Sequence, residues 1–215
     1  MNYSELKANV ADWLNRSDLT TVVPTFIQLA EAKLNRTLRI ADMYTRSQLV
    51  STDNIISMPD DFLEFKSFRV ISPVIRELHE IPAHQIDEYT NSSYLASLDD
   101  AHARFFVYFG TNIRIIPTPA VSHTYEMNYY AKFAALSDSN TTNALISSHP
   151  DLYLYGALVA ASPYLGEDER VPVWDRLLTQ SVSEVQASDD RRRTKGGRHA
   201  LPFASFDSTS TKRVR

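Results

Sequence analysis

Apolar residues recur every three or four positions at both ends of the chain and at about every second position in its middle. Near the N-terminus the first stripe is Leu6, Val10, Trp13 and Leu14, and the second, which follows Pro24, is Ile27, Ala30, Leu34 and Leu38. A period of about 3.6 residues is typical of amphipathic helices. We therefore expect two helices here, folded back on each other as an antiparallel hairpin.

A second helical region spans 148–186. Its first half is apolar on almost every side and rich in small residues, which indicates a helix buried among others. Pro163 and Gly166 end this half, and the second half carries a single apolar stripe from Val171 onward. We expect a second helical hairpin. The residues predicted to form the core or interfaces of the two hairpins are Trp13, Leu34, Tyr155, Leu158, Trp174 and Leu178.

Between the hairpins the apolar period shortens to that of β-strands. The clearest pair is 104–109 with 112–116, because Gly110 and Thr111 form a turn between two apolar runs. Further strands are expected at 44–51, 54–58, 64–71 and 123–132, of which the first two are predicted to pair with each other. These strands predict an antiparallel sheet, arranged as a small sandwich or an open barrel.

Alternation within the predicted strand 64–71 assigns its side chains to two faces. Phe65, Ser67 and Arg69 fall on one face, and Lys66 and Phe68 fall on the other. Strict alternation is expected of a regular strand because successive side chains point to opposite sides.

The predicted fold class is α+β. It is a four-helix bundle formed by two helical hairpins, with an inserted antiparallel β-sandwich or open-barrel domain and an extended C-terminal tail. The expected parts are the first hairpin at 1–41, the β domain at 42–136, the second hairpin at 137–190 and a basic arm at 191–215. The two ends of the insert must lie close together for the hairpins to meet.

Charge is distributed very unevenly along the chain. Residues 191–215 hold eight Lys or Arg and one acidic residue, a net charge of +7, and the whole chain carries −4, so residues 1–190 carry −11. The basic segment is rich in Gly, Pro, Ser and Thr and has no helical or strand period. We expect it to become ordered on a partner.

The basic segment fits phosphate binding or docking on an acidic protein. Its Leu201, Phe203 and Phe206 favour protein docking, because apolar anchors can enter a groove while arginines pair with acids. A nucleic-acid-binding protein that uses this tail is the alternative. The predicted docking residues are Arg191, Arg192, Arg193, Lys195, Arg198, Leu201, Phe203, Phe206, Lys212, Arg213 and Arg215.

Candidate catalytic and cofactor sites are scarce. The chain has no cysteine and no phosphate-binding loop, dinucleotide fingerprint or nucleophile elbow. His79 and His84 are five residues apart with Pro82 between them, so they do not share a helix face as zinc ligands would. The acidic pairs at 60–61 and 99–100 adjoin turns, which favours solvated loops. We expect a protein that binds no cofactor or metal and is not an enzyme. A hydrolase built on the β domain is the least favoured of the functional alternatives.

Nothing in the sequence indicates secretion or a membrane. The first residues lack the basic start and apolar run of a signal peptide, and no segment approaches about 20 apolar residues. The expectation is a soluble, unprocessed protein without a membrane partner.

Several segments occur in an order that resembles a known family. They are MNYSELKANVADWLNRSDL followed by PTFIQLAEAKLNRTLR, the central MPDDFLEFKSFRV, and HPDLYLYGALVAASPYLGEDERVPVWDRLL. Together they resemble the head-to-tail adaptor proteins of short-tailed bacteriophages, the group related to tail tubular protein A. The resemblance covers roughly residues 1–190.

This resemblance implies a virion protein made in the host bacterial cytoplasm and placed at the head–tail interface. It implies a homo-oligomeric ring, commonly of twelve copies, that joins the portal protein to the tail nozzle protein and lines the DNA channel. The C-terminal arm would dock on the portal, and no residue would be catalytic. DNA would pass transiently and without specificity, and an acidic wall would not hold its phosphates.

Overall fold

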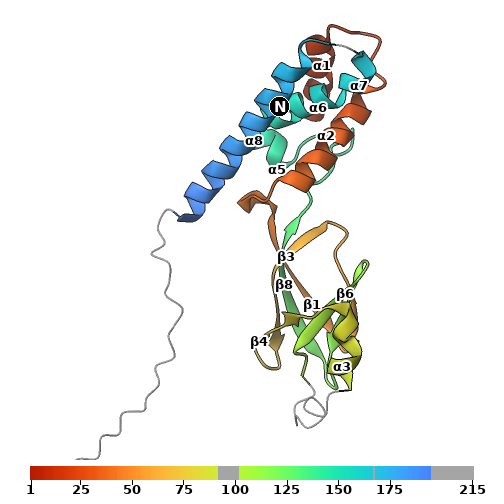
Figure 1. Cartoon of the computed structure of the whole chain (residues 1–215), viewed down its shortest axis with the longest axis vertical. Helices are drawn as coiled ribbons and strands as arrows, with labels where there is room; N and C mark the ends of the chain where they lie inside the picture. Colours follow the sequence, from red (N-terminus) through yellow and green to blue (C-terminus); the bar gives the residue numbers. More distant parts are fainter. Residues whose placement is uncertain (92–101, 167, 195–215) are drawn as a thin grey trace, which may run out of the picture.

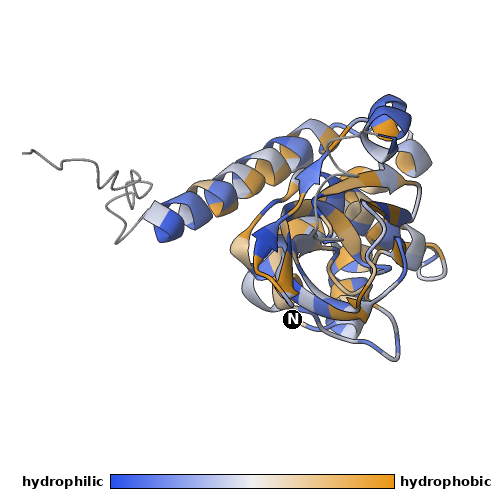
Figure 2. Ribbon diagram, turned by 90° about the horizontal axis from the view of Figure 1, so that it is seen from below, coloured by the Kyte–Doolittle hydropathy of each residue, from blue (hydrophilic) through white to orange (hydrophobic). Residues whose placement is uncertain are grey.

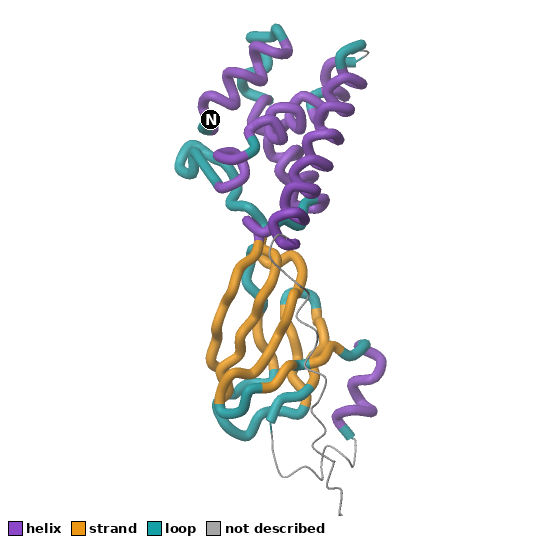
Figure 3. The backbone as a smooth tube through the Cα atoms, turned by 90° about the vertical axis from the view of Figure 1, so that its left-hand side faces the viewer, coloured by secondary structure: helices purple, strands orange, loops and turns teal. Residues whose placement is uncertain are grey.

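The molecule is elongated, with helices at one end and two β-sheets at the other (Figures 1 and 3). The computed structural model describes residues 1–91, 102–166 and 168–194. The helical end contains α1 (Tyr3–Leu14), α2 (Val23–Thr37), α5 (Ala144–Ser148), α6 (Pro150–Ala160), α7 (Ser162–Leu165) and α8 (Val171–Thr194). With α3 (Ile86–Thr90), the described residues form seven α-helices and two four-stranded sheets, which confirms the α+β class.

Helix α6 lies at the centre of the helical end. It packs against α1, α2 and α8, and none of its residues is exposed, so the predicted burial of this helix is confirmed. Gly156 allows α2 to approach closely, because a Cβ at this position would lie 3.0 Å from the Cβ of Ala30. A single core joins these helices, and it contains Leu34, Leu158, Trp174 and Leu178.

Local signals at the helix starts agree with the sequence. Asn2 caps α1 by accepting a hydrogen bond from the Glu5 backbone N–H, and the Glu5 side chain accepts one from the Asn2 backbone N–H. This reciprocal box satisfies two N–H groups that a helix start leaves unpaired. Pro24 lies in the first turn of α2, where a missing N–H costs nothing.

The strands form two separate sheets. The first has the order β1-β8-β3-β4 and the second β2-β7-β6-β5. The bounds are β1 (Tyr44–Ser51), β2 (Ile55–Ser57), β3 (Phe62–Ser72), β4 (Arg76–Glu77), β5 (His79–Glu80), β6 (Phe105–Phe109), β7 (Asn112–Ile116) and β8 (His123–Ala131). Neighbouring strands are antiparallel except β5 and β6. The predicted hairpin turned at Gly110 is confirmed, since β6 pairs with β7 there.

The predicted pairing of 44–51 with 54–58 is wrong. β1 pairs along its whole length with β8, from Tyr44 opposite Tyr130 to Ser51 opposite His123, and β2 pairs with β7. The chain between β1 and β2 crosses from one sheet to the other, which places Ile56 in the core between them. The long β1–β8 ladder and the burial of Ile56 stabilise this pairing more than a short turn between β1 and β2 would stabilise a hairpin.

Apolar side chains from both sheets share one core. It contains Phe68 of β3, Phe106 of β6, Ile113 of β7 and Met127 of β8. The outer face of the second sheet is partly covered by the 3₁₀ turn η2 (Ala83–Gln85) and α3, whose Ile86 packs with Val107 and Ile116.

A β-bulge overturns the predicted alternation in β3. The register to β8 shifts between Phe65 and Ser67. Phe65 therefore points to the same side as Phe68, with 5.6 Å between their ring centroids, and not to the side of Ser67. At a bulge, two residues of one strand lie opposite a single residue of the partner strand. Residues before and after the bulge therefore lie on opposite faces where strict alternation would place them on the same face.

The helical end and the β end are joined by two segments, the linker 38–43 and the chain that follows β8, and we call this junction the waist. The linker 38–43, which contains the 3₁₀ turn η1 (Ala41–Met43), leads into β1, and the chain after β8 leads back to the helices. Because Tyr44 pairs with Tyr130, the two ends of the β part lie side by side. The returning chain is fixed to α2 by Glu31, whose buried Oε1 accepts a hydrogen bond of 2.8 Å from the Leu136 N–H.

Two further expectations differ from the structure. An extended arm beginning at residue 191 is wrong for 191–194, because α8 continues through Thr194. Trp13 does not lie in the core, since 45% of its surface is exposed and its ring packs edge-on against Tyr155, 6.0 Å between centroids. The buried face of α1 is narrower than its sequence suggests, and Leu14, the residue after Trp13, is buried instead.

Candidate interaction surfaces

The last turns of α8 are attached to the linker between the helices and the sheets. Asp189, which is 8% exposed, accepts a hydrogen bond of 3.0 Å from the Ala41 N–H and forms an ion pair of 2.7 Å with Arg193. Arg193 also donates to the carbonyl of Arg39. Gln186 donates to the carbonyl of Thr37, which ends α2. Figure 2 shows that the end of α8 projects from the body and is largely hydrophilic. These contacts explain why helical structure extends into the basic run.

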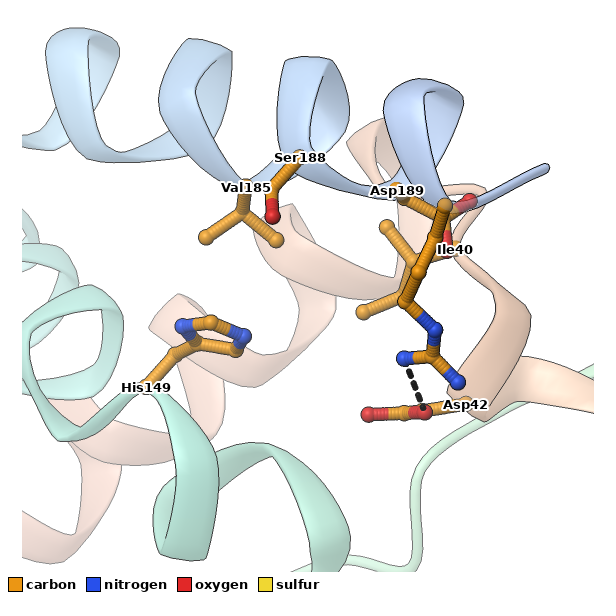
Figure 4. Close-up of a pocket in the computed structure, with 7 residues that line it drawn as sticks. Ile40, Asp42, His149, Val185, Ser188 and Asp189 are labelled. Carbon is orange, nitrogen blue, oxygen red and sulfur yellow. Dashed lines mark ion pairs between the residues drawn. The ribbon is translucent and has the colours of Figure 1, made fainter. Parts of the chain in front are cut away.

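A small cleft of about 40 Å³ lies beneath this part of α8 (Figure 4). Its lining includes His149, Ser188, Asp189 and Asp42, and Asp42 forms an ion pair of 3.7 Å with Arg192. Among the described residues, no hydrogen bond joins His149 to Ser188 or to either aspartate, so the cleft lacks the relay of a nucleophilic site. Nor do the described parts of the chain contain a cluster of three metal-binding side chains.

The outer face of the first sheet carries a buried carboxylate between two arginines. Glu126 of β8 is 1% exposed and forms ion pairs with Arg46 of β1 and Arg69 of β3. Burial alone would raise the pKa of Glu126, but the hydrogen bonds from Arg69 and Gln48 and the two guanidinium charges lower it. The acid is therefore hidden beneath the face, while Arg46 and Arg69 are about half exposed.

Nearer the helices, the same face contains a hollow of about 290 Å³, which we call the waist pocket. It is lined by Ala41, Tyr44, Lys66, Tyr130 and Arg193. The Lys66 ammonium lies 5.6 Å from the centroid of the Tyr130 ring, and the Arg193 guanidinium lies 5.9 Å from the same centroid. Tyr44 meets Tyr130 edge-on at 6.5 Å. The pocket thus combines two aromatic rings with two cations.

Comparison with known proteins gives an independent result. A family model described as SU10 adaptor protein matches residues 1–200, nearly the whole chain. The chain belongs to the SU10 adaptor protein family. This is a family of phage head-to-tail adaptors, so the protein is a structural component of a bacteriophage virion. A search of curated proteins found no match.

The predicted docking residues of this adaptor fall partly within the structure. Arg191, Arg192 and Arg193 are exposed on the last turn of α8, at the base of the arm. The others lie outside the described residues; they are Lys195, Arg198, Leu201, Phe203, Phe206, Lys212, Arg213 and Arg215. No helix in the described parts of the adaptor combines the length and hydropathy of a membrane span.

The waist pocket of the adaptor is not apparent from the sequence alone. Lys66 and Tyr130 come from strands 64 residues apart, and Arg193 comes from a helix that was expected to end earlier. The available signal was the alternation in 123–132, which places Tyr130 and Glu126 on one face of β8. Their cationic partners become apparent once β8 is known to lie between β1 and β3.

Proposed function

We propose that this adaptor forms a closed ring, of twelve copies as in the resembled group, between the portal of the phage head and the tail nozzle. In this proposal α1, α2, α6 and α8 act as a four-helix bundle and the two sheets as a sandwich. The proposed parts are 1–41, 42–136 and 137–190, with α8 continuing into 191–194. A relation to tail tubular protein A is part of the same proposal.

The observation that carries the proposal is the basic end of α8. Three successive arginines lie exposed on its last turn, and Arg192 is 70% exposed. Because Asp189 and Arg193 hold this turn on the linker 38–43, whatever continues from it starts at a defined place on the molecule. A segment with five further cations and three apolar anchors follows at 195–215. We propose that it docks on an acidic groove of the portal.

The acidic body supports passage of DNA through the ring. Residues 1–190 carry a net charge of −11. A negative channel wall repels phosphates and so does not retain DNA as it leaves the head.

Truncation after Thr194 tests the docking arm. Because α8 and its contacts are kept, we expect circular dichroism and thermal unfolding to be unchanged while binding to purified portal rings is lost. Normal portal binding by the truncated chain would refute the docking arm. Salt-dependent binding of duplex DNA by the full chain, lost on truncation without any portal binding, would instead support the nucleic-acid-binding alternative.

A further inference from the structure

The waist pocket contains a cation without an acidic partner. Arg193 is paired with Asp189, whereas Lys66 forms no ion pair within the described part of the chain. Both cations lie within 6 Å of the centroid of one Tyr130 ring. Because Asp189 neutralises Arg193, Lys66 is the cation of this pocket that a carboxylate from outside can pair with. The pocket is therefore suited to a carboxylate.

The backbone aims Lys66 into this position. The bulge between Phe65 and Ser67 keeps Phe65 in the core and turns both Lys66 and Ser67 to the outer side, where Ser67 accepts a hydrogen bond of 2.9 Å from Asn128. Bulges re-aim side chains and are common beside functional sites. A regular strand would have turned Ser67 inward.

Nearby acids of the same chain are already engaged. Glu64 forms an ion pair of 2.8 Å with Arg39, and the buried Glu126 lies between two arginines. Asp189 is bound to Ala41 and Arg193. None of these three carboxylates is left for Lys66, so among the described residues its acidic partner is best supplied by a second copy of the chain.

An acidic pair, Asp60 and Asp61, lies close to the waist. Asp60 and Asp61 precede β3, whose first residue Phe62 pairs with Ala131, next to Tyr130. Asp61 accepts a hydrogen bond of 3.0 Å from the Tyr129 hydroxyl, and the Tyr129 ring belongs to the core between the sheets. Tyr130, the next residue, points to the opposite side of the strand.

Asp60 is available for a partner. It is exposed, and within the described residues its carboxylate forms no ion pair. It borders a hollow of about 340 Å³ that is also lined by Tyr108 of β6 and by Lys132, whose ammonium donates a hydrogen bond of 3.2 Å to the Asp60 backbone carbonyl. The hollow beside Asp60 therefore lies toward the second sheet, whereas the waist pocket lies on the outer face of the first sheet.

We infer that Asp60 of one copy enters the waist pocket of the next copy and pairs with Lys66. This inference rests on the proposed ring. Copies placed side by side around a ring meet through two different surfaces at the same height, which is the heterologous contact that Lys66 and Asp60 supply. Two chains whose bodies are acidic repel each other in general, so a local pairing of opposite charge fixes their register.

Cross-linking tests the contact directly, because the chain has no cysteine. Lys66→Cys and Asp60→Cys are made in separate chains, which are mixed, assembled on portal rings and treated with a short bismaleimide. We expect cross-linked dimers on a denaturing gel. The matched control replaces Asp60→Cys with Asp138→Cys, an exposed position at the helical end, and should give none. Assembly of the mixed chains without the Lys66–Asp60 cross-link would overturn the inference.

Charge reversal provides a second test. Lys66→Asp and Asp60→Lys should each reduce the assembled fraction about tenfold, and the chain carrying both changes should recover most of it. Arg36→Asp, on exposed α2 surface, should assemble normally. Normal assembly of both single variants would overturn the inference. If the unmodified chain fails to assemble on the portal, the proposed ring itself fails.

Discussion

The Asp189 carboxylate near the end of α8 accepts a hydrogen bond from the Ala41 backbone N–H, with 3.0 Å between Oδ1 and N. The two residues are 148 positions apart in the sequence. Ala41 begins the turn that leads into β1, so the contact ties the last helix to the entry of the β part. The Ala41 N–H is partly buried, and a side chain supplies the partner that such a group usually has.

Removal of this acceptor should weaken the fold. We expect Asp189→Ala to lower the free energy of unfolding by about 2 kcal/mol, because the Ala41 N–H loses its partner. Asp189→Asn keeps an acceptor oxygen and should cost less. Urea denaturation gives the energies, and hydrogen exchange at Ala41 reports the bond. An alanine variant that keeps both the urea midpoint and slow exchange at Ala41 would contradict the assignment.

The two tryptophans should respond very differently to substitution. Trp174 is 4% exposed in the helical core, so Trp174→Ala is expected to cost about 3–5 kcal/mol. Trp13 is 45% exposed, and its substitution by alanine mainly removes the ring contact with Tyr155, for which about 1 kcal/mol is expected. Thermal and urea unfolding of the two variants measure the difference. Equal losses would show that Trp13 is buried in solution.

Glu31 should make stability depend on pH. Burial raises its pKa, although the Leu136 N–H and the Tyr153 hydroxyl favour the ionised form. The folded chain therefore binds this proton more tightly than the unfolded chain. The resulting stability is fully present below the ordinary pKa of 4.5 and is lost as the pH rises through the raised value.

Glu31→Gln removes this titration but keeps an acceptor for the Leu136 N–H. We expect the variant to be at least as stable as the parent at neutral pH, and the fall in stability above pH 4.5 to become shallower. Urea unfolding across this pH range measures both. A steeper fall in the variant would have the wrong sign for a raised pKa.

Two buried tyrosines offer a matched pair. The Tyr125 hydroxyl has no hydrogen-bond partner among the described residues, and burial raises its pKa to about 12. Tyr125→Phe should therefore stabilise the protein by about 1 kcal/mol. The Tyr153 hydroxyl accepts from Asn143 at 2.7 Å and donates to Glu31, so Tyr153→Phe should destabilise by about 1–2 kcal/mol. The same sign for both variants, measured by thermal unfolding, would contradict this account.

Local patterns predicted much of the architecture. The apolar run with small residues specified the central helix α6, and Gly110 between two apolar runs specified the hairpin of β6 and β7. The 3.6-residue and two-residue periods arise within single segments, so they can be recognised without knowing what packs against them. The α+β class follows from the order of these segments.

Three features were decided by the tertiary structure. β1 pairs with the distant β8 and not with β2, which follows it in the sequence. The bulge at Lys66 places Phe65 and Ser67 on opposite faces of β3, and α8 extends through Thr194. The sequence by itself determined which segments are helices and strands, because propensity and period act over a few residues. Only the folded chain decided their partners and ends, because those depend on burial and hydrogen bonds between residues as far apart as Ala41 and Asp189.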